Sequence, residues 1–287
     1  MLTFSSVSRR CAAGLSCAAL LVGTGLLSPT TAASVGGALH IGLQPNHKIS
    51  SKPPGGGHGG GGGGGGSSLG WQSSNWSGYA TTSPTPFTGV RGNWSVPSVG
   101  ATSSPSYSAA WVGIDGFNNN SLIQTGTEQD YYNGAPHYTA WWTTSAQNFG
   151  EQPINKPVSP GDPIIATITE TDSNTSTWSI TLQDASGGHG WTFTKSLTYT
   201  GPGASAEWIL EAPTVGGRIA QLAHYSLTTF DPGTIDGNSN PNLVAPDGGE
   251  LVQGFHSQVV SIPSGPDNDT DGFNINYGST PPSAPGS

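Results

Sequence analysis

Cysteine and basic residues are scarce in this chain of 287 residues. Its two cysteines, Cys11 and Cys17, both lie near the amino terminus, and eight lysines and arginines stand against seventeen aspartates and glutamates. If the amino-terminal segment is removed during export, the remaining protein has no thiol, no disulfide and no cysteine metal site. Its stability must then come from packing alone.

Long apolar runs are also rare. The clearest one spans residues 11–27, follows Arg9 and Arg10, and is followed by the small residues 31–33. This order is typical of a secretory signal, and the run is too short and too interrupted by glycine to favour a membrane span. We therefore predict a signal peptide at residues 1–33 and a secreted, extracellular protein with no membrane association after its removal. The paired arginines leave both the general and the twin-arginine export routes open.

Positive charge is almost absent from the larger part of the chain. Four basic and seventeen acidic residues follow Gly66, which gives that part a net charge of −13. Nucleic-acid binding requires clustered lysine and arginine, so we expect no nucleic-acid partner. Such an excess of carboxylates fits a secreted protein that works at low pH, where protonation relieves their repulsion. Solubility is the simpler explanation.

Residues 55–66 are glycine except for His58, and such a run cannot bury enough apolar area to fold. It is predicted to be a flexible linker. The preceding residues 34–54 contain Lys48 and Lys52 and no acidic residue. We predict that residues 34–66 form a basic pro-segment with a Gly-rich linker, able to cover an acidic cleft. A tail with no inhibitory role is the alternative.

Apolar and polar residues alternate through most of the chain after Trp71. The alternating runs, separated by turn residues, are 107–115, 121–128, 137–144, 163–170, 178–183, 191–194, 205–211, 219–230 and 273–277. Period two predicts half-buried antiparallel strands, and no stretch shows a helical stripe. About 200 residues of this kind predict one all-β sandwich or barrel. We place this domain at residues 67–278, followed by a disordered tail at residues 279–287.

Two of these strands carry polar side chains that suit catalysis. Alternation puts Gln124 and Glu128 on one face of their strand, and Glu207 and Glu211 on one face of another. Because Trp208 points the opposite way and suits a core, Glu207 is expected to face outward into a groove. By themselves such residues usually mark only a solvated face.

The order of several short motifs between Trp71 and Tyr277 resembles the glutamic peptidases of the eqolisin type. The motifs are Asn75-Trp76-Ser77-Gly78, Trp111-Val112-Gly113-Ile114-Asp115-Gly116, Leu122-Ile123-Gln124-Thr125-Gly126, Ala140-Trp141-Trp142 and Ala206-Glu207-Trp208-Ile209. The resemblance implies an antiparallel two-sheet β-sandwich, a concanavalin-like jelly roll. It also implies an endopeptidase that acts in acid on protein or peptide substrates, with no metal and no cofactor.

The resemblance also implies roles for particular residues. Glu207 would be general base and then general acid, and Gln124 would orient the water and stabilise the oxyanion. Glu211 is the nearest rival to Glu207. Residues matching the substrate groove or the support of the catalytic pair are Trp76, Gly78, Trp111, Asp115, Gly116, Glu128 and Trp141. Fungal members carry an acid where this chain has Thr143, which leaves the support of the pair and the pH optimum open.

Other chemistries have weaker support. The chain has no Gly-x-Ser-x-Gly motif, and its histidines after the linker show no paired spacing for zinc or a serine triad. Residues 267–272, Asp-Asn-Asp-Thr-Asp-Gly, match the start of a calcium loop. Because Gly278 stands where that loop needs its closing glutamate, we favour a polar turn.

The main alternative function is a carbohydrate-active or carbohydrate-binding lectin-like sandwich. Glu207 and Glu211 lie about 13 Å apart along an extended strand, too far for the roughly 5–9.5 Å between paired glycosidase carboxylates. Glu128 with Glu207 remains open as such a pair. We expect a monomer in either case.

Overall fold

The computed structural model describes residues 41–42, 50–51, 69–147 and 150–286. The predicted signal peptide lies outside the described residues, as does the predicted linker at residues 55–66. Of the predicted pro-segment, only the two short strands β1 and β2 are described. In this part of the chain, no helix is long and apolar enough to cross a membrane.

The described chain is built almost entirely from β-strands. The elements in chain order are β1 (Ile41–Gly42), β2 (Ser50–Ser51), β3 (Trp71–Ser73), β4 (Trp76–Thr82), β5 (Gly89–Ser95), β6 (Ala109–Ile114), β7 (Ile123–Tyr132), β8 (Ala135–Thr144), η1 (Ser145–Gln147), β9 (Gln152–Ile154), β10 (Pro163–Asp172), β11 (Thr177–Asp184), β12 (Trp191–Thr198), β13 (Ser205–Glu211), β14 (Thr214–Val215), β15 (Arg218–Ile219), β16 (Thr228–Ile235), η2 (Ala245–Asp247), β17 (Gly248–Gln253), β18 (Gln258–Pro263) and β19 (Phe273–Tyr277). Two single-turn 3₁₀ helices interrupt the strands.

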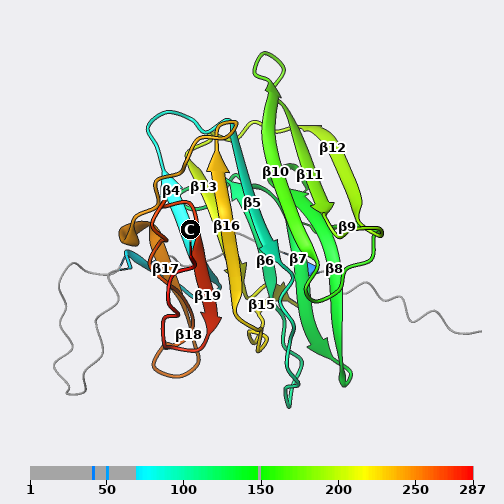
Figure 1. Ribbon diagram of the computed structural model, residues 1–287, viewed down its shortest axis with the longest axis vertical. Coiled ribbons are helices and arrows are strands. Elements are labelled where there is room, and N and C mark those ends of the chain that lie inside the picture. Colours follow the sequence, from blue (N-terminus) through cyan, green and yellow to red (C-terminus); the bar gives the residue numbers. More distant parts are fainter. Residues whose placement is uncertain (1–40, 43–49, 52–68, 148–149, 287) are drawn as a thin grey trace, which may run out of the picture. The chain divides into compact units, whose positions relative to one another are not determined.

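These strands form two antiparallel layers. The first has the order β12-β11-β10-β5-β16-β19-β18, and the second has the order β17-β4-β13-β6-β7-β8-β9. The β17–β18 hairpin joins the layers, and β5, β10 and β11 of the first layer contact β6 and β7 of the second. Figure 1 shows β10, β5, β16 and β19 of the first layer side by side. The predicted all-β sandwich is confirmed.

The main core lies between the two layers. Strand alternation sends Val112 of β6 and Leu210 of β13 toward Val90 of β5 and Ile164 of β10, and all four side chains are buried. Trp208 joins them and donates its indole N–H to the carbonyl of Arg91 at 2.8 Å. The prediction that Trp208 faces the core is therefore confirmed, and Leu210 on the same face of β13 lies in the core as well.

A second apolar cluster covers the other face of the second layer. It contains Trp76, Trp111, Trp141 and Ile209, all at most 1% exposed. Val215 and other partly buried residues pack against it. This face carries the polar residues singled out by the sequence.

One predicted strand is wrong and several strands were missed. The run at residues 219–230 is interrupted: β15 ends at Ile219, β16 begins at Thr228, and Leu222 between them makes only an isolated bridge to Tyr107. At such an isolated bridge Leu222 is buried next to an exposed neighbour, so the sequence alternates there as it does in a strand. β4, β5 and β17 were not predicted because glycines interrupt or flank their apolar residues, and β18 was also not predicted. In the tail, the carbonyl of Ser283 accepts a hydrogen bond from Asn274 at 2.9 Å.

Candidate active site

Glu207 and Gln124 lie in one row across the second layer, on either side of a glycine. Glu207 of β13 pairs with Gly113 of β6, and Gly113 pairs with Gln124 of β7. Two strand spacings separate the backbones of the pair by roughly 9.5 Å, and both side chains leave the same face. A Cβ on residue 113 would meet the Trp111 ring at 2.8 Å. The glycine therefore keeps the space between the two side chains free.

Both polar side chains of this row are buried without partners. Gln124 and Glu207 are each 0% exposed. Within the described part of the chain, no group forms a hydrogen bond with the side-chain amide of Gln124 or with either carboxylate oxygen of Glu207. Leaving such groups unsatisfied costs about 1–3 kcal/mol each, so an arrangement of this kind marks a functional site. Glu207 lies on the face of β13 that we expected. It does not line an open groove, because its side chain is buried.

Burial also changes the protonation of Glu207. Desolvation raises its pKa well above the ordinary glutamate value, and the negative charge of Asp115 raises it further. The hydroxyl of Ser205 lowers the pKa in part, although it does not reach hydrogen-bond geometry with the carboxylate. Burial is the larger effect, since neither carboxylate oxygen has a hydrogen-bond partner among the described residues. In this covered state the neutral carboxylic acid is favoured.

Glu211, the rival candidate, is held by donors. Its carboxylate accepts hydrogen bonds from Asn75 Nδ2 and from Trp111 Nε1, both at 3.0 Å. Burial raises its pKa to about 8 despite these bonds. Its oxygens are thus engaged in fixing Trp111, whereas those of Glu207 are not.

Glu128 lies in the same row as Glu211, on the other side of Ala109. It is 3% exposed, one oxygen accepts a bond from Thr139 at 3.2 Å, and burial with the charges of Asp130 and Glu151 raises its pKa. Four residues along a strand and two strands across place its backbone about 16 Å from that of Glu207. Glycosidase carboxyl groups lie roughly 5–9.5 Å apart, so these two side chains would have to lean toward each other, whereas Glu128 is bonded to Thr139 of β8.

The predicted tryptophans share the face of the pair. Trp76 packs edge-on against Trp111, with ring centroids 4.9 Å apart. Trp111 and Trp141 belong to the next row, with Gly126 between them. All three indoles are buried. The three rings belong to one apolar cluster on the same face of the sheet as Glu207 and Gln124.

Asp115 supports the site from the end of β6 instead of lining it. Its carboxylate accepts hydrogen bonds from Tyr199 Oη at 2.7 Å and from the backbone N–H groups of Gly203 and Ala204 at 2.9 and 2.7 Å. Its own N–H donates to the carbonyl of Ser205, the first residue of β13. Asp115 therefore holds the loop that leads to Glu207.

The two predicted glycines have steric roles. Gly78 has a φ of 136°, and a Cβ there would lie 2.2 Å from the carbonyl oxygen of Trp208. Gly116 also has a positive φ, of 101°, and lies against Leu122 and Trp76. Both shape the aromatic face without offering a polar group.

Thr143 pairs with Gln124 across β7 and β8. Its hydroxyl donates to the carbonyl of Gly150 at 2.9 Å. Where the resemblance leads one to expect an acid, this chain thus has a neutral group engaged with the backbone. Gln124 has no carboxylate neighbour at this position.

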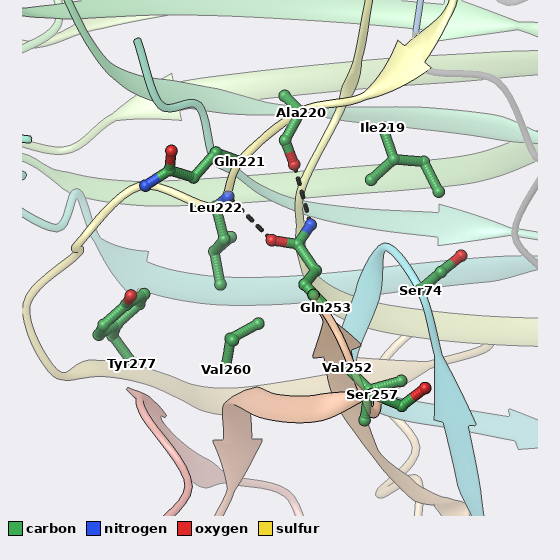
Figure 2. A pocket seen from close by; sticks show the side chains of 11 residues that line it. Ser74, Ile219, Ala220, Gln221, Leu222, Val252, Gln253, Ser257, Val260 and Tyr277 are labelled. Atoms are coloured by element: carbon green, nitrogen blue, oxygen red, sulfur yellow. Dashed lines mark hydrogen bonds between the residues drawn. The ribbon is translucent and has the colours of Figure 1, made fainter. Parts of the chain in front are cut away.

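A well-defined cavity lies away from this pair. It has a volume of about 700 Å³ and is lined mainly by residues of the β15–β16 connection and the β17–β18 hairpin, including Leu222 and Gln253, together with Tyr277 of β19. Figure 2 shows the Gln253 amide bridging the carbonyl of Ala220 and the N–H of Leu222. None of the predicted site residues lines it.

The sequence alone did not point to the spacer Gly113 or to the neighbour Ser205. Gly113 lies within a motif that the resemblance used, but its role depends on strand register, which the motif does not give. Ser205 precedes Glu207 by two residues, so strand period two puts both on one face. That signal was available from the sequence.

The chain is thus an antiparallel β-sandwich with a glutamine and a glutamate in one row, on either side of a sheet glycine. Residues 74–270 match the Peptidase A4 family. The chain therefore belongs to this family, that of the eqolisin-type glutamic peptidases, and is a glutamic endopeptidase.

Solved structures agree with this assignment at the level of the fold. Scytalido-glutamic peptidase with a transition state analog inhibitor is similar over 71% of this chain and 98% of its own, with 24% identity and a TM-score of 0.58. The same peptidase with a peptide-based analog has 25% identity over the same shares and a TM-score of 0.56. SCP-B, an eqolisin in a complex with the tripeptide Ala-Ile-His, has 24% identity over the same shares and a TM-score of 0.54. Among curated proteins, none matches the chain significantly.

Proposed function

We propose that this protein is a secreted endopeptidase that hydrolyses peptide bonds in acid, with Glu207 as general base and acid and Gln124 as oxyanion stabiliser. The observation that carries the proposal is the unpartnered, buried Gln124–Glu207 pair on either side of Gly113. A structural polar pair would be satisfied by its neighbours, as Glu211 is by Asn75 and Trp111.

In the proposed mechanism Glu207 acts first as a base and then as an acid, while Gln124 only donates a hydrogen bond. The Glu207 carboxylate takes a proton from water while the water oxygen bonds to the peptide carbonyl carbon, and the carbonyl electrons move to oxygen. The Gln124 N–H donates to this oxyanion. The protonated Glu207 then donates its proton to the leaving nitrogen as the C–N bond breaks. No metal is required by this sequence of steps.

A neutral glutamine suits this chemistry in acid because its donor does not titrate. Glu207 must be ionised to act as the base, and in the covered state its raised pKa opposes ionisation. Uncovering the face rehydrates the carboxylate and returns its pKa toward the ordinary glutamate value. Covering and uncovering would therefore switch the protonation of the base as well as its access to substrate.

Strand pairing supports a covering role for residues 34–66. β1 of this segment pairs with β14, and β2 pairs with β3. Trp71 of β3 belongs to the aromatic cluster on the face of the catalytic pair, and Val215 of β14 packs against that cluster. A polypeptide substrate cannot reach a pair that is 0% exposed. We propose that residues 34–66 are a pro-segment whose removal opens this face.

Deleting residues 34–66 tests this pro-segment role. The full secreted form is expected to cleave little at neutral pH and to mature after acidification, with a lag in proteolysis. The deletion form is expected to lose the lag or to fold in much lower yield, because the segment either covers or assists the domain. Progress curves, with mass spectrometry of the amino terminus, measure this. Unchanged lag and unchanged yield would contradict the proposal and favour a tail with no inhibitory role.

Acid should stabilise the folded protein. Burial raises the pKa of Glu211 and of Glu151 to about 8 each, so folding favours their neutral forms. The contribution is complete below the ordinary pKa near 4.5 and is lost as the pH rises through about 8. For Glu211 alone it is on the order of 5 kcal/mol.

Urea unfolding of the Glu207→Gln variant between pH 4 and pH 8 measures this effect without self-digestion. We expect the midpoint to fall as the pH rises, and to fall less after Glu211→Gln is added. A midpoint that rises steadily over this range would show that these carboxyls are not buried in neutral form.

A further inference from the structure

Three carboxylates converge on the first layer, away from the Gln124–Glu207 row. Asp231 belongs to β16, and Asp267 and Asp271 belong to the loop between β18 and β19. One oxygen from each lies within 4.8 Å of the other two. Asp231 reaches the loop because Phe230 pairs with Phe273, which brings the next residue of β16 toward Gly272.

The convergence leaves buried oxygens without partners. Asp267 is 7% exposed, and its Oδ1 accepts the N–H of Asp271 at 3.1 Å. Its Oδ2, like Oδ1 of Asp271, is buried and has no hydrogen-bond partner among the described residues. A Cβ on Gly272 would lie 2.4 Å from that Oδ2 and 2.9 Å from Cγ of Asp231. The glycine is thus required for the three carboxylates to approach.

No described basic side chain compensates this charge. Carboxylates this close are stable only when they are protonated or share a cation.

We infer that Asp231, Asp267 and Asp271 form a calcium site that ties β16 to the loop preceding β19. Two oxygens bound to one Ca²⁺ at 2.3–2.6 Å lie at most about 5 Å apart, which the cluster satisfies. A donor set made only of oxygen suits a hard cation and not zinc. Ca²⁺ tolerates irregular geometry and completes its shell with carbonyls or water, whereas Mg²⁺ requires a near-ideal octahedron.

The sequence predicted a polar turn instead of a calcium loop here because the closing glutamate is missing. The fold supplies a different third carboxylate. In a calcium loop of the sequence type, Asp267, Asp269 and Asp271 would bind together and a glutamate would close the loop at Gly278. Here Asp269 is exposed and outside the cluster. Asp231, from a distant strand, supplies the third carboxylate in its place.

Thermal unfolding of the full chain at neutral pH tests the site, first in a chelator and then with excess CaCl₂. When calcium exceeds its dissociation constant about a hundredfold, the midpoint should rise by roughly 5–10 °C. Asp267→Asn should abolish the rise, and Asp231→Asn should do so if the first variant does not fold. Asp269→Asn, the same change in the same loop, should keep most of it.

Titration calorimetry of the full chain with CaCl₂ gives a direct measure of binding. A wild-type protein with neither heat of binding nor a rise in midpoint would overturn the inference. So would a rise that both Asp267→Asn and Asp231→Asn retain, or one that Asp269→Asn abolishes. Because the readouts are binding and stability, failure of the proposed catalytic roles would not affect the result.

Discussion

Replacing Glu207 with glutamine is expected to lower kcat for the hydrolysis of denatured protein in acid by at least about 10²–10⁴-fold. Glutamine keeps the size of the side chain and can still form hydrogen bonds, but it cannot accept the proton of the attacking water. KM should change little because the lost interaction acts mainly in the transition state. Steady-state kinetics on a soluble peptide measure both constants.

The comparison requires proteins with the same amino terminus, confirmed by mass spectrometry, because an inactive variant does not process itself. Glu170→Gln is the matched control: the same change on a half-buried residue of β10, in the other layer. It should leave kcat unchanged. If Glu207→Gln still cleaves at the wild-type rate, the assignment is wrong and Glu211 or Glu128 becomes the next candidate.

The second large effect is expected at Gln124. Gln124→Ala should lower kcat by roughly 10²–10³-fold, since it removes the donor that meets the developing oxyanion. Gln124→Glu should be at least as harmful, because a carboxylate in that position repels the oxyanion and the ionised Glu207. Peptide kinetics at several acidic pH values measure both variants.

Gln183→Ala is the control for this substitution, since Gln183 is a partly exposed residue of β11 in the other layer. It should not change kcat. A Gln124→Ala protein with unchanged kcat and a higher KM would contradict the proposed role, because Gln124 would then bind the ground state and the transition state equally.

Much of the fold could be predicted because period two is a local signal. Residues 205–211 alternate so regularly that the core position of Trp208 and the opposite face of Glu207 follow from the sequence. The shared face of Gln124 and Glu128 follows in the same way. The family resemblance, which the match to Peptidase A4 confirms, added the choice of sandwich over barrel.

The rest depends on register and on distant parts of the chain. No local pattern shows that Gly113 stands between Glu207 and Gln124, because that requires the pairing of β13, β6 and β7. Likewise, no local pattern shows that Val215 of β14 packs against the aromatic cluster on this face. Asp231 is separated from Asp267 by three elements, so their convergence has no sequence signature.

The central claim is that this chain cleaves peptide bonds in acid through a Glu–Gln pair, and acid proteolysis by the matured wild-type protein tests it most directly. Denatured casein and a polysaccharide are each incubated with it at acidic and neutral pH, with and without pepstatin, a chelator and a serine reagent. We predict cleavage of casein in acid only, unaffected by the three inhibitors, and no release of sugar. Casein left intact in acid, or release of sugar from the polysaccharide, would contradict the account.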